Sequence, residues 1–203
     1  MTKKLISLLM IFGLMSAFVT GLYAAEKPTK KAKQTPQGLY LTPKEAFDMI
    51  KANPSKVLFV DVRTPAEVLF VGHAAGLDKN IPFKYIDYSK FVMTKKGHKK
   101  FASWKNPQLV QEFDAALKAK GLSKEDPVIV ICRSGDRSGM TATALYKAGY
   151  KKAYTITTGF EGDMSKTKPR RRSVNGWKND GLPWTYKFQP ELFIPKPTPP
   201  AGK

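Results

Sequence analysis

The chain has 203 residues, a length that favours one domain with flanking segments. Hydrophobic residues make up 42 % of it, which suffices for one globular core and excludes a protein with many membrane spans. The formal net charge of +19 indicates a soluble, positively charged surface, with attraction for an acidic partner or an anionic membrane face as the alternative. Because no nucleic-acid recognition motif accompanies the charge, we do not expect nucleic acid as a partner. The single cysteine excludes an internal disulfide.

The first 24 residues have the pattern of a secretory signal peptide. Lys3 and Lys4 make the start of the chain positive, the run 5–19 is almost entirely apolar, and small residues follow up to Ala25. The apolar run is shorter than the ~20 residues that a membrane span prefers. We therefore expect cleavage near Ala24 or Ala25, export to the periplasm, and no transmembrane segment in the mature chain. Secretion and an uncleaved N-terminal anchor are the alternatives.

Composition then divides the rest of the chain into three parts. Residues 25–37 are rich in Lys, Pro, Thr and Gln, which is typical of a flexible basic linker. Residues 189–203 form a Pro-rich tail that we expect to be extended and loose. Residues 38–188 between them contain the alternating apolar patterns of a folded domain.

The first half of this domain shows short apolar strands separated by one well-marked helix. Thr42, Pro43 and Glu45 form a capping signal that predicts a helix start at this point. Strands are predicted over 38–41, 57–62 and 80–82, and a short helix over 65–70.

The second half opens with residues 83–106, which are aromatic, basic and without a clear period. We interpret them as an insertion with at most one short helix. Helices are predicted over 108–120 and 138–147, the latter with Met140 facing inward, and strands over 128–131 and 153–156. Strands that alternate with helices in this way predict an α/β fold with a central parallel sheet of about five strands and helices on both faces.

One loop collects the residues that carry chemistry. Cys132 directly follows the apolar run 128–131, and a helix is expected to begin near Ser138, so the loop lies at the carboxyl end of a buried strand. Backbone N–H groups in such a turn and the positive end of the helix can converge on one point. The intervening residues are Arg133, Ser134, Gly135, Asp136 and Arg137. We expect an anion-binding loop with the sulfur at its centre.

This environment gives the lone cysteine a chemical role. Positive potential favours the thiolate of Cys132 over the thiol, and Arg133 and Arg137 add two cations that Asp136 partly offsets. A thiolate among cations is a nucleophile suited to anionic substrates, and Gly135 permits the tight turn. An inert buried thiol is the alternative. The two histidines and one cysteine have no metal-ligand spacing, so we expect no metal and no other cofactor.

The loop and four other segments resemble, in the same order, signatures of the rhodanese-type sulfurtransferases. The resemblance covers roughly residues 38–187 and implies the rhodanese-like fold. The segments that carry it are Asp61-Val-Arg63 with Glu67 and Gly72-His73, Asn80-Ile-Pro82, Cys132–Arg137, Gly159–Gly162, and Gly176-Trp177 with Gly181–Pro183.

The resemblance also implies a mechanism. Cys132 would take the outer sulfur of a small anionic donor such as thiosulfate, form a persulfide, and pass the sulfur to a thiol or cyanide acceptor. Backbone amides from Arg133 to Ser138 would hold the persulfide, with Arg133 and Arg137 attracting and steadying the donor. The alternative is a non-catalytic sulfur carrier or a periplasmic protein-binding module on the same scaffold.

Loop length argues against a cysteine-dependent phosphatase. Such an enzyme needs an arginine six positions after the cysteine, so that its planar fork meets phosphate with two hydrogen bonds. Here that position is Ser138, and Arg137 lies five positions after Cys132.

The sequence also departs from the family pattern. The segment 67–72 is one residue longer than is usual, and two insertions fall near 83–106 and 163–175. The second insertion carries a basic cluster at 166–172, which could bind an acidic protein partner.

Four polar or charged residues outside the loop have structural interpretations. Asp61 ends an apolar strand and is expected to accept backbone N–H bonds or to brace the cysteine loop. Arg63 and Glu67 are expected to form an ion pair that supports the same region. His73 is expected to be a packing and hydrogen-bonding residue rather than a catalytic one.

Overall fold

The structure is a computed structural model that describes residues 25–194. The expected signal peptide and the last nine residues of the Pro-rich tail lie outside the described residues. Within the described range, no helix is both long and apolar enough to cross a bilayer.

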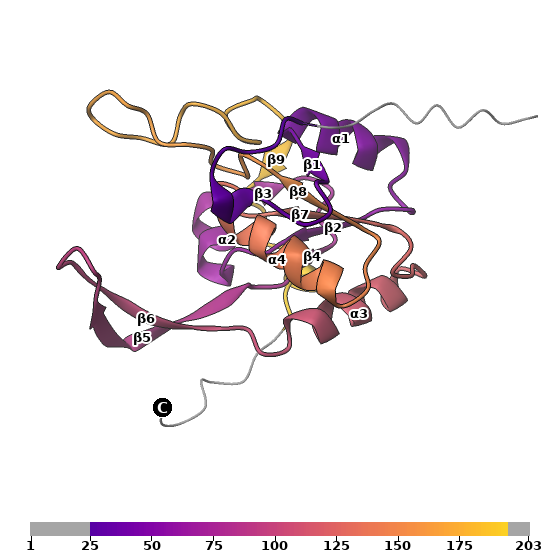
Figure 1. The fold of residues 1–203 in the computed structure, drawn as a ribbon, viewed down its shortest axis with the longest axis horizontal. Helices are drawn as coiled ribbons and strands as arrows, with labels where there is room; N and C mark the ends of the chain where they lie inside the picture. The colour runs from indigo at the N-terminus through magenta and orange to yellow at the C-terminus, as the bar shows by residue number, and fades with distance from the viewer. Residues whose placement is uncertain (1–24, 195–203) are drawn as a thin grey trace, which may run out of the picture.

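A five-stranded parallel sheet forms the centre of the domain, as the sequence predicts (Figure 1). Its spatial order is β1, β8, β7, β2, β4. The register pairs Asp61 at the end of β2 with Ile131 at the end of β7, so the loops after these strands start side by side. The strands are β1 (Tyr40–Leu41), β2 (Leu58–Asp61), β4 (Lys79–Asn80), β7 (Pro127–Ile131) and β8 (Lys152–Ile156).

Both faces of the sheet are covered, because successive residues of its central strands point to opposite sides. Val128 and Val130 pack with helices α3 (Leu109–Ala119) and α4 (Asp136–Lys147). Ile129 and Ile131 lie in the other core cluster. There they join Phe59, the helix α1 (Pro43–Ala52) and Trp177, whose ring stacks on Phe59 at 5.4 Å between centroids.

Two helices begin with the same reciprocal cap. Thr42 and Glu45 form the expected capping box at the start of α1. Thr64 and Glu67 form a second one at the start of α2 (Pro65–Val71), which directly follows the loop after β2. The cap fixes the Glu67 carboxylate beside the first turn of α2, at the carboxyl end of the sheet.

Residues 83–106 contain an antiparallel hairpin rather than a short helix. Strand β5 (Lys84–Met93) pairs with β6 (Lys99–Lys105), with a register irregularity between Asp87 and Phe91. The hairpin extends away from the sheet (Figure 1). Its aromatic side chains interact across the two strands, as in the stacked pair Phe91–Phe101, and such cross-strand pairs stabilise the hairpin. The sequence analysis did not predict these strands because residues 83–106 have no clear period.

Both flanking segments pack against the domain where they are described, although we expected them to be flexible. The linker contains a 3₁₀ turn, η1 (Lys31–Lys33), that lies against α4, where the absence of a side chain at Gly139 leaves room for the Lys33 backbone. The tail begins with η2 (Pro190–Leu192), and its Leu192 is only 4 % exposed. A second pairing, β3 (His73–Ala74) with β9 (Trp184–Thr185), ties the C-terminal segment to the domain.

Substitution of Gly139 by Ala should displace the linker. A methyl group there would lie 2.9 Å from the Lys33 carbonyl oxygen, too close for a backbone that cannot move aside locally. Although Ala favours a helix by about 1 kcal/mol over Gly, we expect faster tryptic cleavage after Lys31 and Lys33. The control is Tyr146→Ala on the exposed side of the same helix. Equal cleavage rates in wild type and Gly139→Ala would contradict the packing described.

Candidate active site

The loop that contains the cysteine links β7 to α4, as the sequence predicts. Cys132 follows the last residue of β7, and α4 begins at Asp136, two residues earlier than expected. Gly135 makes the turn possible because its φ is +96°, and a Cβ there would lie 2.1 Å from the Thr157 carbonyl oxygen. Only glycine fits this position.

The Cys132 sulfur, although its residue is only 1 % exposed, has polar neighbours. The Gly135 N–H donates a hydrogen bond to Sγ at 3.1 Å. The Ser138 hydroxyl lies 3.5 Å from Sγ, donates to the Gly135 carbonyl at 3.0 Å, and accepts from Thr155 at 2.8 Å. The Ser138 hydroxyl is therefore held beside the sulfur, where rotation of its single proton can serve either the carbonyl or a thiolate.

The outer side of the loop is bonded to the segment after β8. The carbonyl oxygens of Cys132 and Arg133 accept hydrogen bonds from the N–H groups of Phe160 at 2.7 Å and Glu161 at 2.9 Å. In a trans peptide the N–H points opposite to the carbonyl, so the next two amides point away from this segment. The first amides of α4 have no partner within the helix. These donors can bind an anion near the sulfur.

Arg137, and not Arg63 as the sequence analysis predicted, forms an ion pair with Glu67 across the site. Its two terminal nitrogens donate to the two carboxylate oxygens of Glu67 at 2.7 and 2.6 Å. The expected partner of Glu67 was Arg63, but the capping box turns the Glu67 carboxylate toward α4. The pair joins the N-termini of α2 and α4 with the bidentate geometry typical of a strong charge-assisted contact.

Charge and burial shift the ionisation of both partners. Burial by itself raises the pKa of Glu67, but the hydrogen bonds and charge of Arg137, with those from Thr64, outweigh it and hold the pKa at about 2. Burial lowers the pKa of Arg137, and the Glu67 carboxylate more than offsets this, so the pKa is raised. Both groups therefore remain charged throughout the ordinary pH range.

Arg63 pairs instead with Asp61, and both side chains are fully buried. The Arg63 guanidinium donates to the Asp61 carboxylate at 2.7 Å and to the Gly72 carbonyl at 2.7 Å. It also lies 4.3 Å from the centre of the Phe160 ring, and the Phe160 N–H donates to the Cys132 carbonyl. Asp61 accepts the backbone N–H of Arg63 at 2.8 Å. The pair therefore supports the cysteine loop indirectly, through Phe160.

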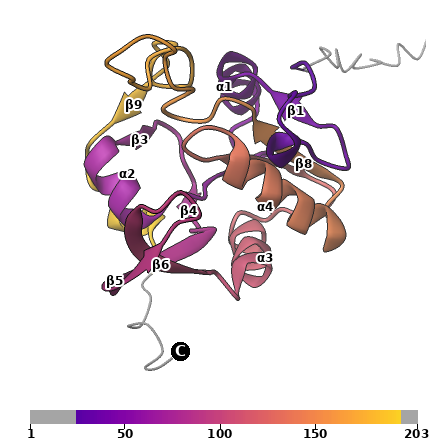
Figure 2. The same ribbon diagram turned by 60° about the vertical axis from the view of Figure 1, so that its left-hand side comes forward.

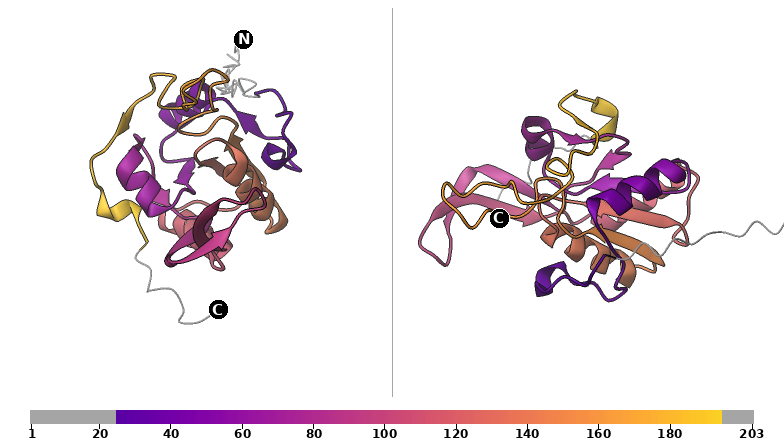
Figure 3. Two further views of the ribbon diagram at one scale, coloured as in Figure 1. Left: turned by 90° about the vertical axis from the view of Figure 1, so that its left-hand side faces the viewer. Right: turned by 90° about the horizontal axis from the view of Figure 1, so that it is seen from above.

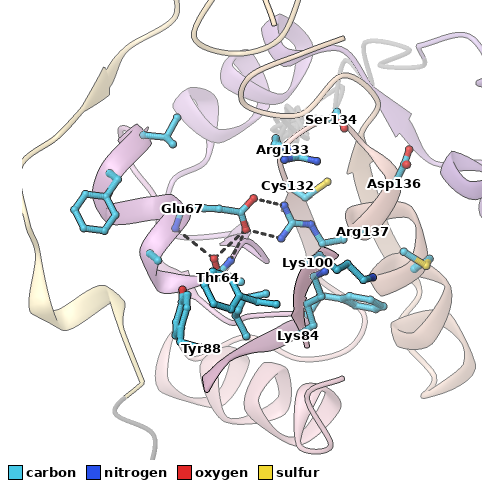
Figure 4. A pocket seen from close by; sticks show the side chains of 17 residues that line it. Thr64, Glu67, Lys84, Tyr88, Lys100, Cys132, Arg133, Ser134, Asp136 and Arg137 are labelled. Carbon is cyan, nitrogen blue, oxygen red and sulfur yellow. Dashed lines mark hydrogen bonds and ion pairs between the residues drawn. The ribbon is translucent and has the colours of Figure 1, made fainter. Parts of the chain in front are cut away.

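A cavity of about 760 Å³ opens at Cys132 (Figure 4). Helices α2 and α4 lie on opposite sides of it, and the hairpin β5–β6 lies below them in the view of Figure 2. Met140, expected to face inward, is 41 % exposed and lines this cavity. The remaining apolar lining comes from Ala66, Phe70, Val71, Phe83, Ile86, Tyr88 and Phe101.

The polar lining of the cavity carries an excess of positive charge. Arg137 is paired with Glu67, and Asp136 is paired with Lys30 of the linker. Three further cations line the cavity with no ion pair among residues 25–194, namely Lys84, Lys100 and Arg133. Partial burial, followed by the charges of Arg137 and Lys100, lowers the pKa of Lys84. This excess positive charge favours an anionic ligand.

The structure brings together most of the residues proposed from the sequence. Cys132, Arg133, Ser134, Asp136 and Arg137 line the cavity. The others lie outside its lining. Gly135 and Ser138 contact the sulfur, whereas the buried pair of Asp61 and Arg63 supports the cysteine loop through Phe160.

The sequence analysis did not place several residues of this candidate site. The spacing of Thr64 and Glu67, which is typical of a capping box, could have indicated where the Glu67 carboxylate lies. No local signal could have placed Lys84 and Lys100, because their position depends on how the hairpin folds over the site. His73 makes hydrogen-bonding contacts to backbone carbonyls of Ala74 and Lys187, consistent with a packing residue.

Comparison with known proteins agrees with the fold. Residues 42–166, more than half of the chain, match the rhodanese-like domain. The chain therefore belongs to the rhodanese-like family, a family of sulfurtransferase type.

Similar proteins extend over most of the chain. The uncharacterized protein RC0915 of Rickettsia conorii is 33 % identical over 143 residues, which cover 70 % of this chain and 93 % of that protein. The crystal structure of Rv0390 from M. tuberculosis is 28 % identical, with a TM-score of 0.50, and covers 73 % of this chain and 97 % of that one. A shorter match, 46 % identical over 41 residues, covers 20 % of this chain and 39 % of the thiosulfate sulfurtransferase GlpE of Tolumonas auensis.

Substitution of Asp61 by Ala should destabilise the fold strongly. It would leave the Arg63 guanidinium buried without its counter-charge, at a cost of about 3–5 kcal/mol in the free energy of unfolding. Urea denaturation measures this. The matched control is Asp48→Ala, which removes an exposed i,i+4 pair with Lys44 and should cost at most about 0.5 kcal/mol. Similar losses for both variants would contradict the supporting role of the buried pair.

The Glu67 ion pair should make stability depend on acid pH. The folded-state pKa of about 2 lies below the ordinary 4.5, so the pair stabilises the fold fully above pH 4.5 and loses its effect as pH falls toward 2. The wild-type unfolding free energy should exceed that of Glu67→Gln by at most about 3 kcal/mol above pH 4.5. This difference should shrink as pH falls through that window. A difference independent of pH would show that the carboxylate is not responsible.

Proposed function

We propose that this protein transfers sulfane sulfur from a small anionic donor such as thiosulfate to a thiol or cyanide acceptor through a persulfide on Cys132. The observation that carries the proposal is the position of Sγ. It accepts the Gly135 N–H at 3.1 Å and lies in a cavity lined by three cations that have no ion-pair partner within residues 25–194. A nucleophilic sulfur among backbone donors and cations suits attack on an anion.

The two half-reactions conserve atoms and charge. The Cys132 thiolate attacks the outer sulfur of thiosulfate, the new sulfur–sulfur bond forms as the old one breaks, and sulfite leaves with the bonding electron pair. An acceptor thiolate or cyanide then attacks the outer sulfur of the persulfide, and the Cys132 thiolate is restored. No external oxidant or reductant enters either step.

Each loop residue has a role in this scheme. Amides between Arg133 and Ser138 stabilise the charge on the donor and on the persulfide. Arg133 attracts the donor, and Arg137, held by Glu67, supplies a charge in a fixed position. The short match to a thiosulfate sulfurtransferase supports thiosulfate as a donor. The mechanism uses no metal, and residues 25–194 contain no cluster of His, Cys, Asp and Glu side chains suited to one.

We also propose that the protein acts in the periplasm after removal of residues 1–24. The apolar run with two preceding lysines supports export. The excess of basic residues supports an anionic partner, either the donor itself or an acidic protein.

Substitution of Cys132 by Ser should abolish sulfur transfer. Thiosulfate:cyanide turnover should fall by at least about a thousand-fold, because the hydroxyl cannot form a persulfide. Mass spectrometry of wild type after thiosulfate treatment should show a gain of one sulfur atom on Cys132, and the variant should show none. Turnover that survives the substitution would refute the mechanism. A wild-type persulfide that no acceptor removes would favour the alternative, a sulfur carrier without turnover.

A further inference from the structure

The hairpin β5–β6 presents an unusual surface to solvent. Tyr88 and Phe91 are 60 % and 62 % exposed, and Met93 and Phe101 beside them are also exposed. Seven lysines and a single acid, Asp87, lie between residues 84 and 105. Clusters of exposed aromatic side chains usually mark a binding surface, and the surrounding positive charge indicates an acidic partner.

This surface is continuous with the cavity at Cys132. Lys84, Ile86 and Tyr88 from β5, with Lys100 and Phe101 from β6, line the cavity. Phe101 also stacks on Phe91, with ring centroids 4.9 Å apart, and lies 5.2 Å from Tyr88. An apolar path therefore leads from the exposed part of the hairpin to the region of the sulfur.

The cavity is far larger than a small inorganic anion requires. Its volume of about 760 Å³ lies within the ~300–1,000 Å³ of sites that bury drug-sized ligands, and its lining is largely apolar. Thiosulfate or cyanide would occupy only a small part of it and would leave Phe70, Phe83 and Met140 without contact. A ligand with a longer body, partly apolar and partly acidic, would use the whole surface.

We propose that the hairpin β5–β6 binds an acidic polypeptide segment whose own cysteine is the sulfur acceptor of Cys132. This inference rests on the proposed function and specifies its acceptor. The hairpin lysines attract the acidic side chains, the exposed aromatic rings pack against an apolar residue of the segment, and the acceptor cysteine enters the cavity.

The transfer step then has defined partners. The acceptor thiol gives its proton to solvent, and its thiolate attacks the outer sulfur of the Cys132 persulfide. One sulfur–sulfur bond forms on the acceptor as the bond to Cys132 breaks, and Cys132 leaves as the thiolate. The acceptor ends as a persulfide.

The position of the hairpin favours it over the other basic segment. The loop 163–175, which carries the cluster 166–172 expected to bind an acidic partner, extends from the same end of the molecule (Figure 3). None of its residues lines the cavity at Cys132. An anionic membrane would also be attracted to the lysines. However, the hairpin lines the cavity at Cys132, where the proposed transfer needs an acceptor thiol, and lipids contain none.

The test compares acceptors on the persulfide form, prepared with thiosulfate. The probes are a short synthetic peptide with one cysteine, flanked by glutamates and a leucine, and the same peptide with lysines in place of the glutamates. Single-turnover loss of the sulfur from Cys132 should be at least about ten-fold faster with the acidic peptide, and this advantage should shrink with salt.

Variants locate the binding surface. The first variant combines Phe91→Ser with Lys99→Gln, two residues outside the cavity lining. It should lower the ratio of the transfer rate to the acidic peptide over the transfer rate to cyanide about ten-fold. If this variant folds poorly, Lys90→Gln with Lys99→Gln leaves the aromatic rings intact and should lower the same ratio. The matched control, Lys51→Gln with Lys118→Gln, changes two exposed lysines in the last turns of α1 and α3, at the opposite end of the sheet. It should leave the ratio unchanged.

Three results would overturn the proposal. The two peptides could react equally fast, or the hairpin variants could keep the wild-type ratio. The third result combines two observations. The hairpin would bind vesicles that contain phosphatidylglycerol but not vesicles of phosphatidylcholine, and the hairpin variants would transfer sulfur to the peptide at the wild-type rate. This result would show that the surface binds a membrane instead. Failure to form the Cys132 persulfide would instead refute the proposed function itself, and with it this inference.

Discussion

The site depends on the turn at Gly135, which changes the direction of the chain between the end of β7 and the start of α4. The turn needs a left-handed residue, and the space where a Cβ would lie is filled by the Thr157 carbonyl oxygen. Because the turn is so tight, the Gly135 N–H reaches back to the Cys132 sulfur, and the Ser138 hydroxyl from the first turn of α4 lies beside it. One backbone constraint thus places the cysteine sulfur, its hydrogen-bonding partners and the positive end of a helix together.

A second constraint fixes the charges around this turn. The capping box of α2 holds the Glu67 carboxylate, and Glu67 in turn holds the Arg137 guanidinium with two hydrogen bonds. Because the Arg137 guanidinium is already paired, it is held in one position and cannot move with a bound ligand. It therefore contributes a positive charge at a fixed position. Arg133, Lys84 and Lys100, which have no ion-pair partner in the described part of the chain, give the cavity its excess positive charge. The buried pair of Asp61 and Arg63 supports the same loop from the sheet side.

The hairpin β5–β6 extends the lining of the cavity at Cys132 beyond the cysteine loop and helices α2 and α4. It adds two lysines and four apolar or aromatic residues, counting Phe83 at its base, to the lining of the cavity, and it carries exposed aromatic rings beyond it. Under the two proposals made above, the small centre around Cys132 receives sulfur from an inorganic anion, and the large adjoining surface binds the acceptor polypeptide. Such a combination allows a protein to accept sulfur from a small molecule and deliver it to a specific acceptor.

The sequence alone determined the parallel sheet, its flanking helices and the position of the cysteine loop between β7 and α4. Those features follow from local periodicity, from capping residues and from a cysteine placed between an apolar strand and a helix start. Tertiary structure decided the rest: Glu67 pairs with Arg137 rather than Arg63, residues 83–106 contain a hairpin that lines the site, and residues 31–33 pack on α4. Each of these contacts joins residues that are distant in the chain or depends on strand pairing without a clear period. A side chain's nearest partner in space cannot be read from its neighbours in sequence.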